Sequence, residues 1–311
     1  MARIIYQEFD IPIEPKKVRS PKKFKKIVNC CFINTIFLMK QKKDDFHEQN
    51  LTSFSTRVYY YALKEILQIT SNFITWAFIF DDYIGMHHDN REETCERVLQ
   101  IGYGNLSPRK EEVLRPLEAL FSEILESIKK QSTNKWQKRF IDSIRNWFVF
   151  TNILMQHKMN DTIPTVTEFI CYRWFDAASD MFLPQSFHFE IVMQHLVHAV
   201  GSVIFSINDI FSYEKETREN HLNLVAAIKN EMKVQVQEAI DKTYDFARAQ
   251  IQRYFLLRNQ LHHFYDMNDE VIKKFINGFD HVVRGIYDYH FKESRYFKNL
   301  PLKTNSLTKL Q

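Results

Sequence analysis

The chain has 311 residues and a formal net charge of +4, with 45% hydrophobic and 26% charged residues. This balance supplies a sizeable core and excludes a wholly disordered chain. Only 6 glycines and 8 prolines are present, well below the average of roughly 7% glycine and 5% proline. Turn-rich all-β folds and folds with glycine-rich loops are therefore disfavoured, and a mostly helical chain is predicted.

Residues 1–23 are predicted to form an irregular N-terminal segment, because Pro12, Pro15 and Pro21 interrupt any helix there. The basic residues between 16 and 26 are interpreted as solvated, since they lack the aromatic or glycine pattern of a nucleic-acid-binding module. No apolar run approaches the ~20 residues that span a bilayer, and the N-terminus lacks a signal-peptide layout. We therefore expect no nucleic-acid partner, no membrane span and, with four cysteines in no metal-binding spacing, a cytoplasmic location.

Helical patterns follow in chain order without any composition change that would separate two domains. Thr165 and Glu168 have capping-box spacing and open one of these helices. A single all-α domain is predicted over residues 24–300, and the tail after Pro301 is expected to be mobile. The expected helices cover about 27–36, 54–83, 107–130, 134–158, 165–180, 184–216, 221–262 and 268–296.

Polar residues at a spacing of four follow the strongly apolar segment 191–207. Asn208, Ser212 and Glu216 project from one helix face, because each step of four residues turns the helix by about 400°. Their amide, hydroxyl and carboxylate oxygens suit a hard divalent ion such as Mg²⁺. Taken alone, the same spacing is also typical of an ordinary helix emerging into solvent, and the triad by itself favours that alternative.

A second candidate ligand pair stands at the end of the aromatic-rich helix 73–80. Asp81 and Asp82 follow Phe80 directly, and acids near a helix C-terminus are unfavourable to the helix dipole. A purely stabilising role is therefore disfavoured, and the pair is predicted to hold metal facing the first set.

In combination, these motifs resemble a class I terpene synthase of the microbial or amoebal single-domain type. Residues 208–216 match the family's N-D-x-x-S-x-x-x-E triad, and Asn223-Leu224-Val225 matches the N-L-V that follows it. Segment 285–289 resembles the family's G-N-L-D-W, with Tyr289 in the tryptophan's place. The matches run in family order from about residue 76 to 296. The aspartate motif departs from the family, since Gly85 and Met86 occupy the slot of the third acid.

The resemblance implies a helical bundle around a central apolar cavity and assigns roles to individual residues. Asp81, Asn208, Ser212 and Glu216 would bind metal, with three Mg²⁺ ions expected and Mn²⁺ an alternative, while Asp82 and Asp89 remain open as ligands. Asp176 would link the diphosphate sensor Arg173 to a helix break at Ala177. Phe78, three residues before Asp81 and so on nearly the same helix face, and Tyr289 are expected to line the pocket, with ordinary core packing the alternative for each. The residues expected to bind diphosphate are Arg173, Lys215, Arg295 and Tyr296.

The resemblance further implies the reaction. The enzyme would ionise a linear prenyl diphosphate, release diphosphate, and cyclise the carbocation or quench it inside the apolar pocket. A chain of this size is expected to use farnesyl diphosphate as a sesquiterpene synthase, acting as a monomer or homodimer. The alternatives are a C10 or C20 substrate, a prenyl chain-elongating synthase, and a catalytically inactive helical protein. The chain-elongating enzyme would carry a second aspartate-rich motif where this chain has residues 208–216.

Overall fold

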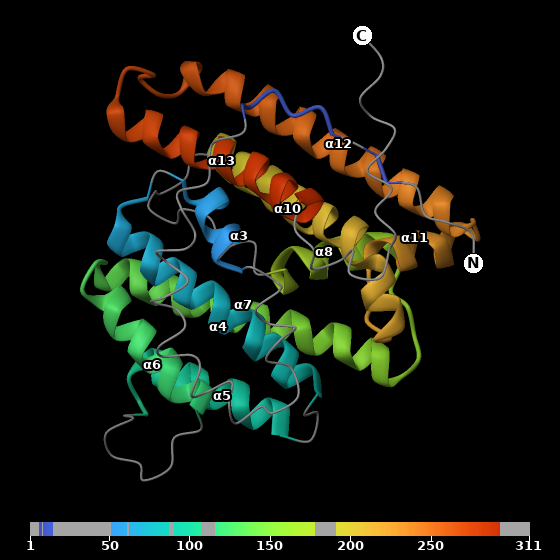
Figure 1. Cartoon of the computed structure of the whole chain (residues 1–311), viewed down its shortest axis with the longest axis horizontal. Coiled ribbons are helices and arrows are strands. Elements are labelled where there is room, and N and C mark those ends of the chain that lie inside the picture. The colour runs from blue at the N-terminus through green and yellow to red at the C-terminus, as the bar shows by residue number, and fades with distance from the viewer. Residues whose placement is uncertain are drawn as a thin grey trace.

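The computed structural model contains helices and no strand among the residues it describes, which are 6–7, 9–14, 51–60, 62–86, 90–106, 116–177 and 191–292. The predicted all-α fold is confirmed by this architecture (Figure 1). The helices are α3 (Leu51–Val58), α4 (Lys64–Met86), α5 (Arg91–Tyr103), α6 (Pro116–Lys129), α7 (Asn134–Met159), α8 (Val166–Asp176), α10 (Ile191–Arg218), α11 (Leu224–Met232), α12 (Val236–Gln260), the 3₁₀ turn η2 (Leu261–His263) and α13 (Glu270–Lys292).

Several predicted helix boundaries agree closely with the structure. Helix α7 covers the expected 134–158 with one further residue. Helix α8 begins with the predicted capping box, in which the Thr165 hydroxyl accepts from the Glu168 amide while the Glu168 carboxylate accepts from the Thr165 amide. This helix ends at Asp176, before the expected Asp180. The helix expected near 27–36, the start of the one expected from 107, and the tail lie outside the described residues.

Two predictions of a long continuous helix are wrong, because the structure has two helices in each of these ranges. The helix expected over 54–83 is two helices, and the break lets α3 pack on α13 while α4 packs on α6. The helix expected over 221–262 is also two, because Lys233 adopts a left-handed conformation with φ 54° and ends α11. Helix α5 was not predicted, although Gly104 ends it in the left-handed conformation that glycine favours.

The buried apolar side chains form two clusters rather than one. One cluster is built mainly from α3, α8 and α10 to α13, which occupy the upper part of Figure 1. The other is built from α4, α5, α6 and α7 in the lower part of the same view. Ile74 of α4 and Leu154 of α7 belong to the upper cluster and so tie the two together. This arrangement sets the two groups of helices face to face around a shared interior.

Helix α10 is the central helix of the upper cluster and packs on α8, α11, α12 and α13. Residues 192–218 pass a length and hydropathy test for a membrane span, but 83% of the apolar window is buried inside the protein. The apolar composition of α10 is therefore explained by its place in the core.

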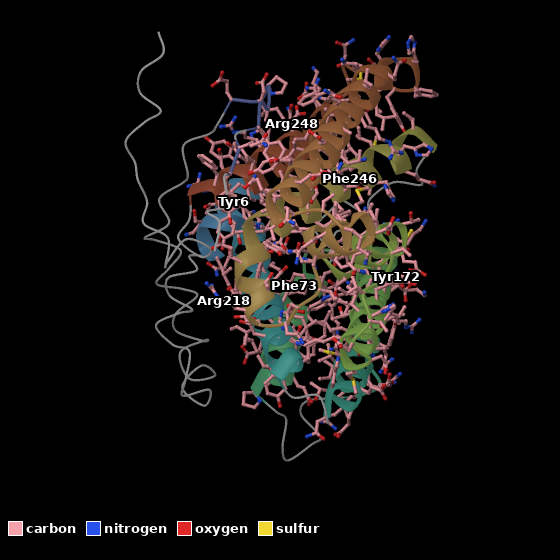
Figure 2. The ribbon with its side chains drawn as sticks, turned by 90° about the vertical axis from the view of Figure 1, so that its right-hand side faces the viewer. Tyr6, Phe73, Tyr172, Arg218, Phe246 and Arg248 are labelled. Carbon is pink, nitrogen blue, oxygen red and sulfur yellow. The ribbon has the colours of Figure 1, made fainter. Side chains whose placement is uncertain are left out.

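The N-terminal segment lies against α12 and α10. Tyr6 stacks on Phe211 of α10 with ring centroids 5.5 Å apart, and the Gln7 amide donates to the Tyr244 hydroxyl at 3.0 Å. Gln7 also accepts a hydrogen bond from Arg248 of α12, and Tyr6 and Arg248 lie in the same upper region of Figure 2. Part of the segment expected to be irregular is therefore anchored to the core.

The α3–α13 contact yields a stability prediction at two glycines of α13. A Cβ at Gly285 would lie 2.7 Å from the backbone C and O of Arg57, whereas one at Gly278 would meet nothing within 4 Å. Gly285→Ala should therefore destabilise the protein by about 1–3 kcal/mol, because α13 must move away from α3. Gly278→Ala, the matched control, should stabilise it by up to about 1 kcal/mol through helix propensity. Thermal unfolding of both variants checks this, and equal melting temperatures would contradict it.

Candidate active site

A cavity of about 210 Å³ lies between the two helix groups. Helices α3, α4, α5, α7, α8, α10 and α13 all contribute lining residues. One part of the wall is apolar and partly aromatic, and the rest carries acids, amides and basic groups. The apolar part includes Phe54, Phe78, Trp147, Leu154, Ile204 and Ile286.

Two of the three α10 residues reach the cavity. Asn208 and Glu216 line the cavity, and Ser212, between them on the same helix face, is buried with 2% of its surface exposed. The Asn208 side-chain nitrogen lies 3.0 Å from Nε2 of His290, whose Nδ1 lies 2.8 Å from the Ile286 carbonyl. Because that carbonyl can only accept, Nδ1 is the donor and Nε2 accepts from Asn208. The Asn208 amide oxygen is thereby directed away from His290.

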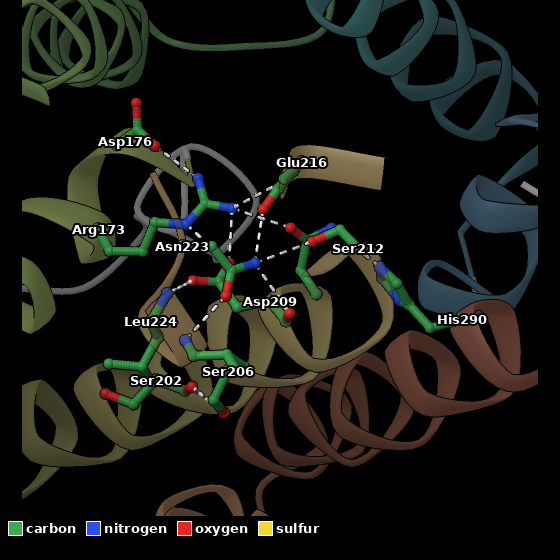
Figure 3. Close-up of polar contacts among 12 residues, drawn as sticks. Arg173, Asp176, Ser202, Ser206, Asp209, Ser212, Glu216, Asn223, Leu224 and His290 are labelled. Carbon is green, nitrogen blue, oxygen red and sulfur yellow. Dashed lines mark hydrogen bonds and ion pairs between the residues drawn. The ribbon is translucent and has the colours of Figure 1, made fainter. Parts of the chain in front are cut away.

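Arg173 of α8 connects the end of α8 to polar side chains of α10 through hydrogen bonds (Figure 3). Its guanidinium donates to the Asp209 carboxylate at 2.7 and 2.9 Å, to Asn208 Oδ1 at 2.9 Å and to Asp176 at 2.5 Å. Burial alone would lower the pKa of Arg173, but the carboxylates of Asp209, Asp176 and Glu216 raise that pKa well above its ordinary value. Arg173 therefore stays charged at the edge of the cavity.

Asp209 is a structural partner that the sequence did not single out. It is completely buried, and besides Arg173 it accepts a hydrogen bond from the Leu224 amide at 2.8 Å. That amide belongs to the first residue of α11. Asp209 thus fixes Arg173 and the start of α11 with one carboxylate (Figure 3).

Asn223 is a second such partner, at the N-cap of α11. Its side-chain oxygen accepts from the Val225 amide at 2.8 Å, and its nitrogen donates to the Asp209 carbonyl at 2.9 Å. The same nitrogen lies 2.6 Å from Glu216 Oε2 and 3.5 Å from Ser212 Oγ. Asn223 therefore holds two members of the triad in place, and its match to the family's N-L-V was the sequence signal for it.

The acidic pair of α4 lies on another part of the same cavity wall. Helix α4 continues to Met86, so Asp81 and Asp82 stand within its final turns rather than after its end, and both line the cavity. Asp81 is exposed in this water-accessible interior. The protein around the cavity shields the Asp81 carboxyl from bulk water, and this desolvation raises its pKa to about 7. The carboxylates of Asp176 and Asp82 raise the pKa further, whereas Arg173 and Arg91 oppose the rise.

The carboxylates of Asp82 and Asp176 repel that of Asp81, and a divalent cation bound beside Asp81 would relieve this repulsion. Among the described residues, no three His, Cys, Asp or Glu side chains gather at metal-binding distance. A metal at the α10 wall would therefore use the amide and hydroxyl oxygens of Asn208 and Ser212 as well as Glu216, which is a donor set suited to Mg²⁺.

The remaining predicted site residues divide into three groups. Phe78, Lys215, Asp176 and Ala177 line the cavity, and Lys215 lies 3.5 Å from Glu219. Tyr289 was expected to line the pocket, but it is fully buried and packs edge-on against Phe54 at 5.1 Å, so it stands behind that lining residue. The residues outside the described part of the chain are Asp89, Arg295 and Tyr296.

The polar cavity residues of α4 and α10 lie within a region of the chain that matches a known protein family. The family "Terpene synthase family 2, C-terminal metal binding" matches residues 72–253, which include both Asp81 and the α10 triad. The chain belongs to this terpene synthase family. As the matched region is the family's metal-binding domain, this terpene synthase is a metal-binding enzyme.

Sequence relatives support the same assignment, and a solved structure shares the fold. The chain is 23% identical over 259 residues to a (+)-T-muurolol synthase from Roseiflexus castenholzii, covering 78% of each chain. It is 25% identical over 268 residues to a 10-epi-cubebol synthase from Sorangium cellulosum, covering 80% of this chain and 84% of the relative. The linalool/nerolidol synthase structure from Streptomyces clavuligerus has the same fold, with a TM-score of 0.80, 14% identity, and coverage of 93% and 100%.

Proposed function

We propose that this terpene synthase converts farnesyl diphosphate to a sesquiterpene with Mg²⁺ as its metal. The observation that carries the proposal is that Asp81 and the α10 residues Asn208 and Glu216 line one cavity whose other walls are apolar and aromatic. The muurolol synthase relative is named as cyclising (2E,6E)-farnesyl diphosphate, which supports a fifteen-carbon substrate.

In this proposal the metal ligands come from two helices. Asp81 would hold Mg²⁺ from α4, and Asn208, Ser212 and Glu216 would hold it from α10, with three ions in all and Mn²⁺ a possible substitute. Bound Mg²⁺ would supply concentrated positive charge to the diphosphate as its C–O bond breaks. Asp82 and Asp89 are further candidate ligands on the α4 side.

The chain's own cations would bind the leaving group. Hydrogen bonds to the diphosphate oxygens would come from Arg173, Lys215, Arg295 and the Tyr296 hydroxyl. The guanidinium of Arg173 is oriented by its hydrogen bonds to Asp209 and Asp176. Asp176 would relay diphosphate binding to the end of α8 at Ala177, which is the last residue described there.

The apolar walls would protect the carbocation. Phe54, Phe78 and Trp147 line the cavity, and each ring face in contact with the cation would stabilise it by about 0.5–2 kcal/mol. Exclusion of bulk water by these walls would let the cation cyclise before it is quenched.

We further propose that the enzyme is cytoplasmic and is a monomer or homodimer. The free thiols of Cys95 and Cys171 fit a reducing compartment.

Gas chromatography of organic extracts after incubation with farnesyl diphosphate tests the proposal. We expect a fifteen-carbon product that requires Mg²⁺, disappears with chelator, and needs no isopentenyl diphosphate. Geranyl and geranylgeranyl diphosphate serve as the ten- and twenty-carbon comparisons and should give less product. A requirement for isopentenyl diphosphate would instead identify a chain-elongating enzyme, and no product from any substrate would overturn the proposal.

A further inference from the structure

Arg91 is a buried arginine whose guanidinium makes no hydrogen bond to the described residues. It is the first residue of α5, and only 4% of its surface is exposed. None of its three guanidinium nitrogens has a hydrogen-bond partner among the described residues. A buried cation without compensating hydrogen bonds is unfavourable, so such a group points to a missing anion.

The neighbouring arginines of the same region differ from Arg91 in this respect. Arg97, further along α5, makes two hydrogen bonds of 2.9 Å to the carboxylate of Glu118. Arg173 is already bonded to three side chains, Asn208, Asp209 and Asp176. Of these three arginines, only Arg91 has all of its guanidinium N–H groups without a hydrogen bond to a described residue, so all of them can bind a ligand.

Arg91 faces the cavity rather than the core. It lines the cavity together with Asp81 of α4 and Lys158 of α7. Burial lowers the pKa of Lys158 and the Arg91 charge adds to this lowering, although Glu219 opposes it. Two cations that repel one another thus stand at one side of a cavity, which favours an anion between them.

We propose that Arg91 binds the diphosphate group directly from α5, with Lys158 beside it, as an additional cationic contact of the active site. The planar fork matches the oxygens of a phosphate group and can donate to two of them at once. The proposal rests on the proposed function, because it assigns Arg91 to the same diphosphate. It places a diphosphate contact on the same side of the cavity as Asp81, in addition to Arg173 of α8.

Titration calorimetry with inorganic pyrophosphate and Mg²⁺ tests this assignment in the full-length enzyme. Arg91→Gln should bind Mg²⁺-pyrophosphate about 10- to 100-fold more weakly than the wild type and raise KM for farnesyl diphosphate similarly, since it loses a charge-assisted pair. Arg91→Lys should fall between the two because it keeps the charge without the fork. The control Arg145→Gln removes a cation from a half-exposed side chain of α7 outside the cavity and should leave binding unchanged.

The ligand-free melting temperature separates binding from a structural role. We expect Arg91→Gln to melt at or above the wild-type temperature without ligand, and to gain less stability from Mg²⁺-pyrophosphate. If the wild type binds pyrophosphate and forms product while Arg91→Gln or Arg91→Lys binds equally well, only the Arg91 assignment is wrong. If the wild type itself binds no Mg²⁺-pyrophosphate, the proposed function and this assignment fall together.

Discussion

Glu216→Gln and Asn208→Ala should each reduce product formation from farnesyl diphosphate by about 100- to 1000-fold or more, a loss typical of removing one preorganised electrostatic group from an active site. Both residues line the cavity on one face of α10, and each variant removes an oxygen ligand or its charge. The helical circular dichroism spectrum should be unchanged, because neither residue belongs to an apolar cluster.

Glu214→Gln is the matched control for this result. It makes the same chemical change on the same helix, at a residue that does not line the cavity and whose charge acts on Tyr6. Its turnover should stay near the wild-type rate. Wild-type turnover in Glu216→Gln or Asn208→Ala would remove α10 from the metal site.

Asp209→Asn should produce the largest loss of stability among single substitutions at the site. The Asp209 carboxylate is fully buried and paired with Arg173, so the variant leaves a buried guanidinium without its main counter-charge. Breaking a buried ion pair by changing one partner costs about 3–5 kcal/mol. The melting temperature should fall by roughly 5–10 °C, and turnover should fall as well because Arg173 loses its orientation.

Asp142→Asn provides the comparison for Asp209→Asn. It also removes the charge of a paired carboxylate, but from a partly exposed site on α7, where Asp142 contacts Lys138 at 2.8 Å and the asparagine oxygen can still accept from Tyr103. Surface pairs contribute about 0–1 kcal/mol, so its melting temperature should change little. Equal melting temperatures for the two variants would show that Asp209 does not hold the site together.

Local sequence rules predicted the parts of the structure that depend on local interactions. The capping box at Thr165 and the face shared by Asn208, Ser212 and Glu216 follow from spacing along a single helix. The breaks after Val58 and at Lys233 do not, because packing on different partners and a left-handed lysine leave no glycine or proline signal in the sequence.

The residues that support the site were harder to predict than those expected to act in it. Asp209 bonds to Arg173 from 36 positions away, and only the fold brings those side chains together. Tyr289 was predicted to line the pocket because its motif fixes a position on α13. The motif does not show that Phe54 of α3 lies between that position and the cavity. Arg91 had no pattern at all, since an unpaired guanidinium is visible only when its surroundings are known.

A crystal structure of the enzyme soaked with Mn²⁺ and pyrophosphate would show whether α4 and α10 hold metal around a diphosphate. Anomalous scattering locates each Mn²⁺ ion independently of the protein. We expect metal peaks beside Asp81 and beside Asn208, Ser212 and Glu216, with pyrophosphate between them in the cavity. Peaks confined to the outer surface, or pyrophosphate bound with no metal at either helix, would contradict it.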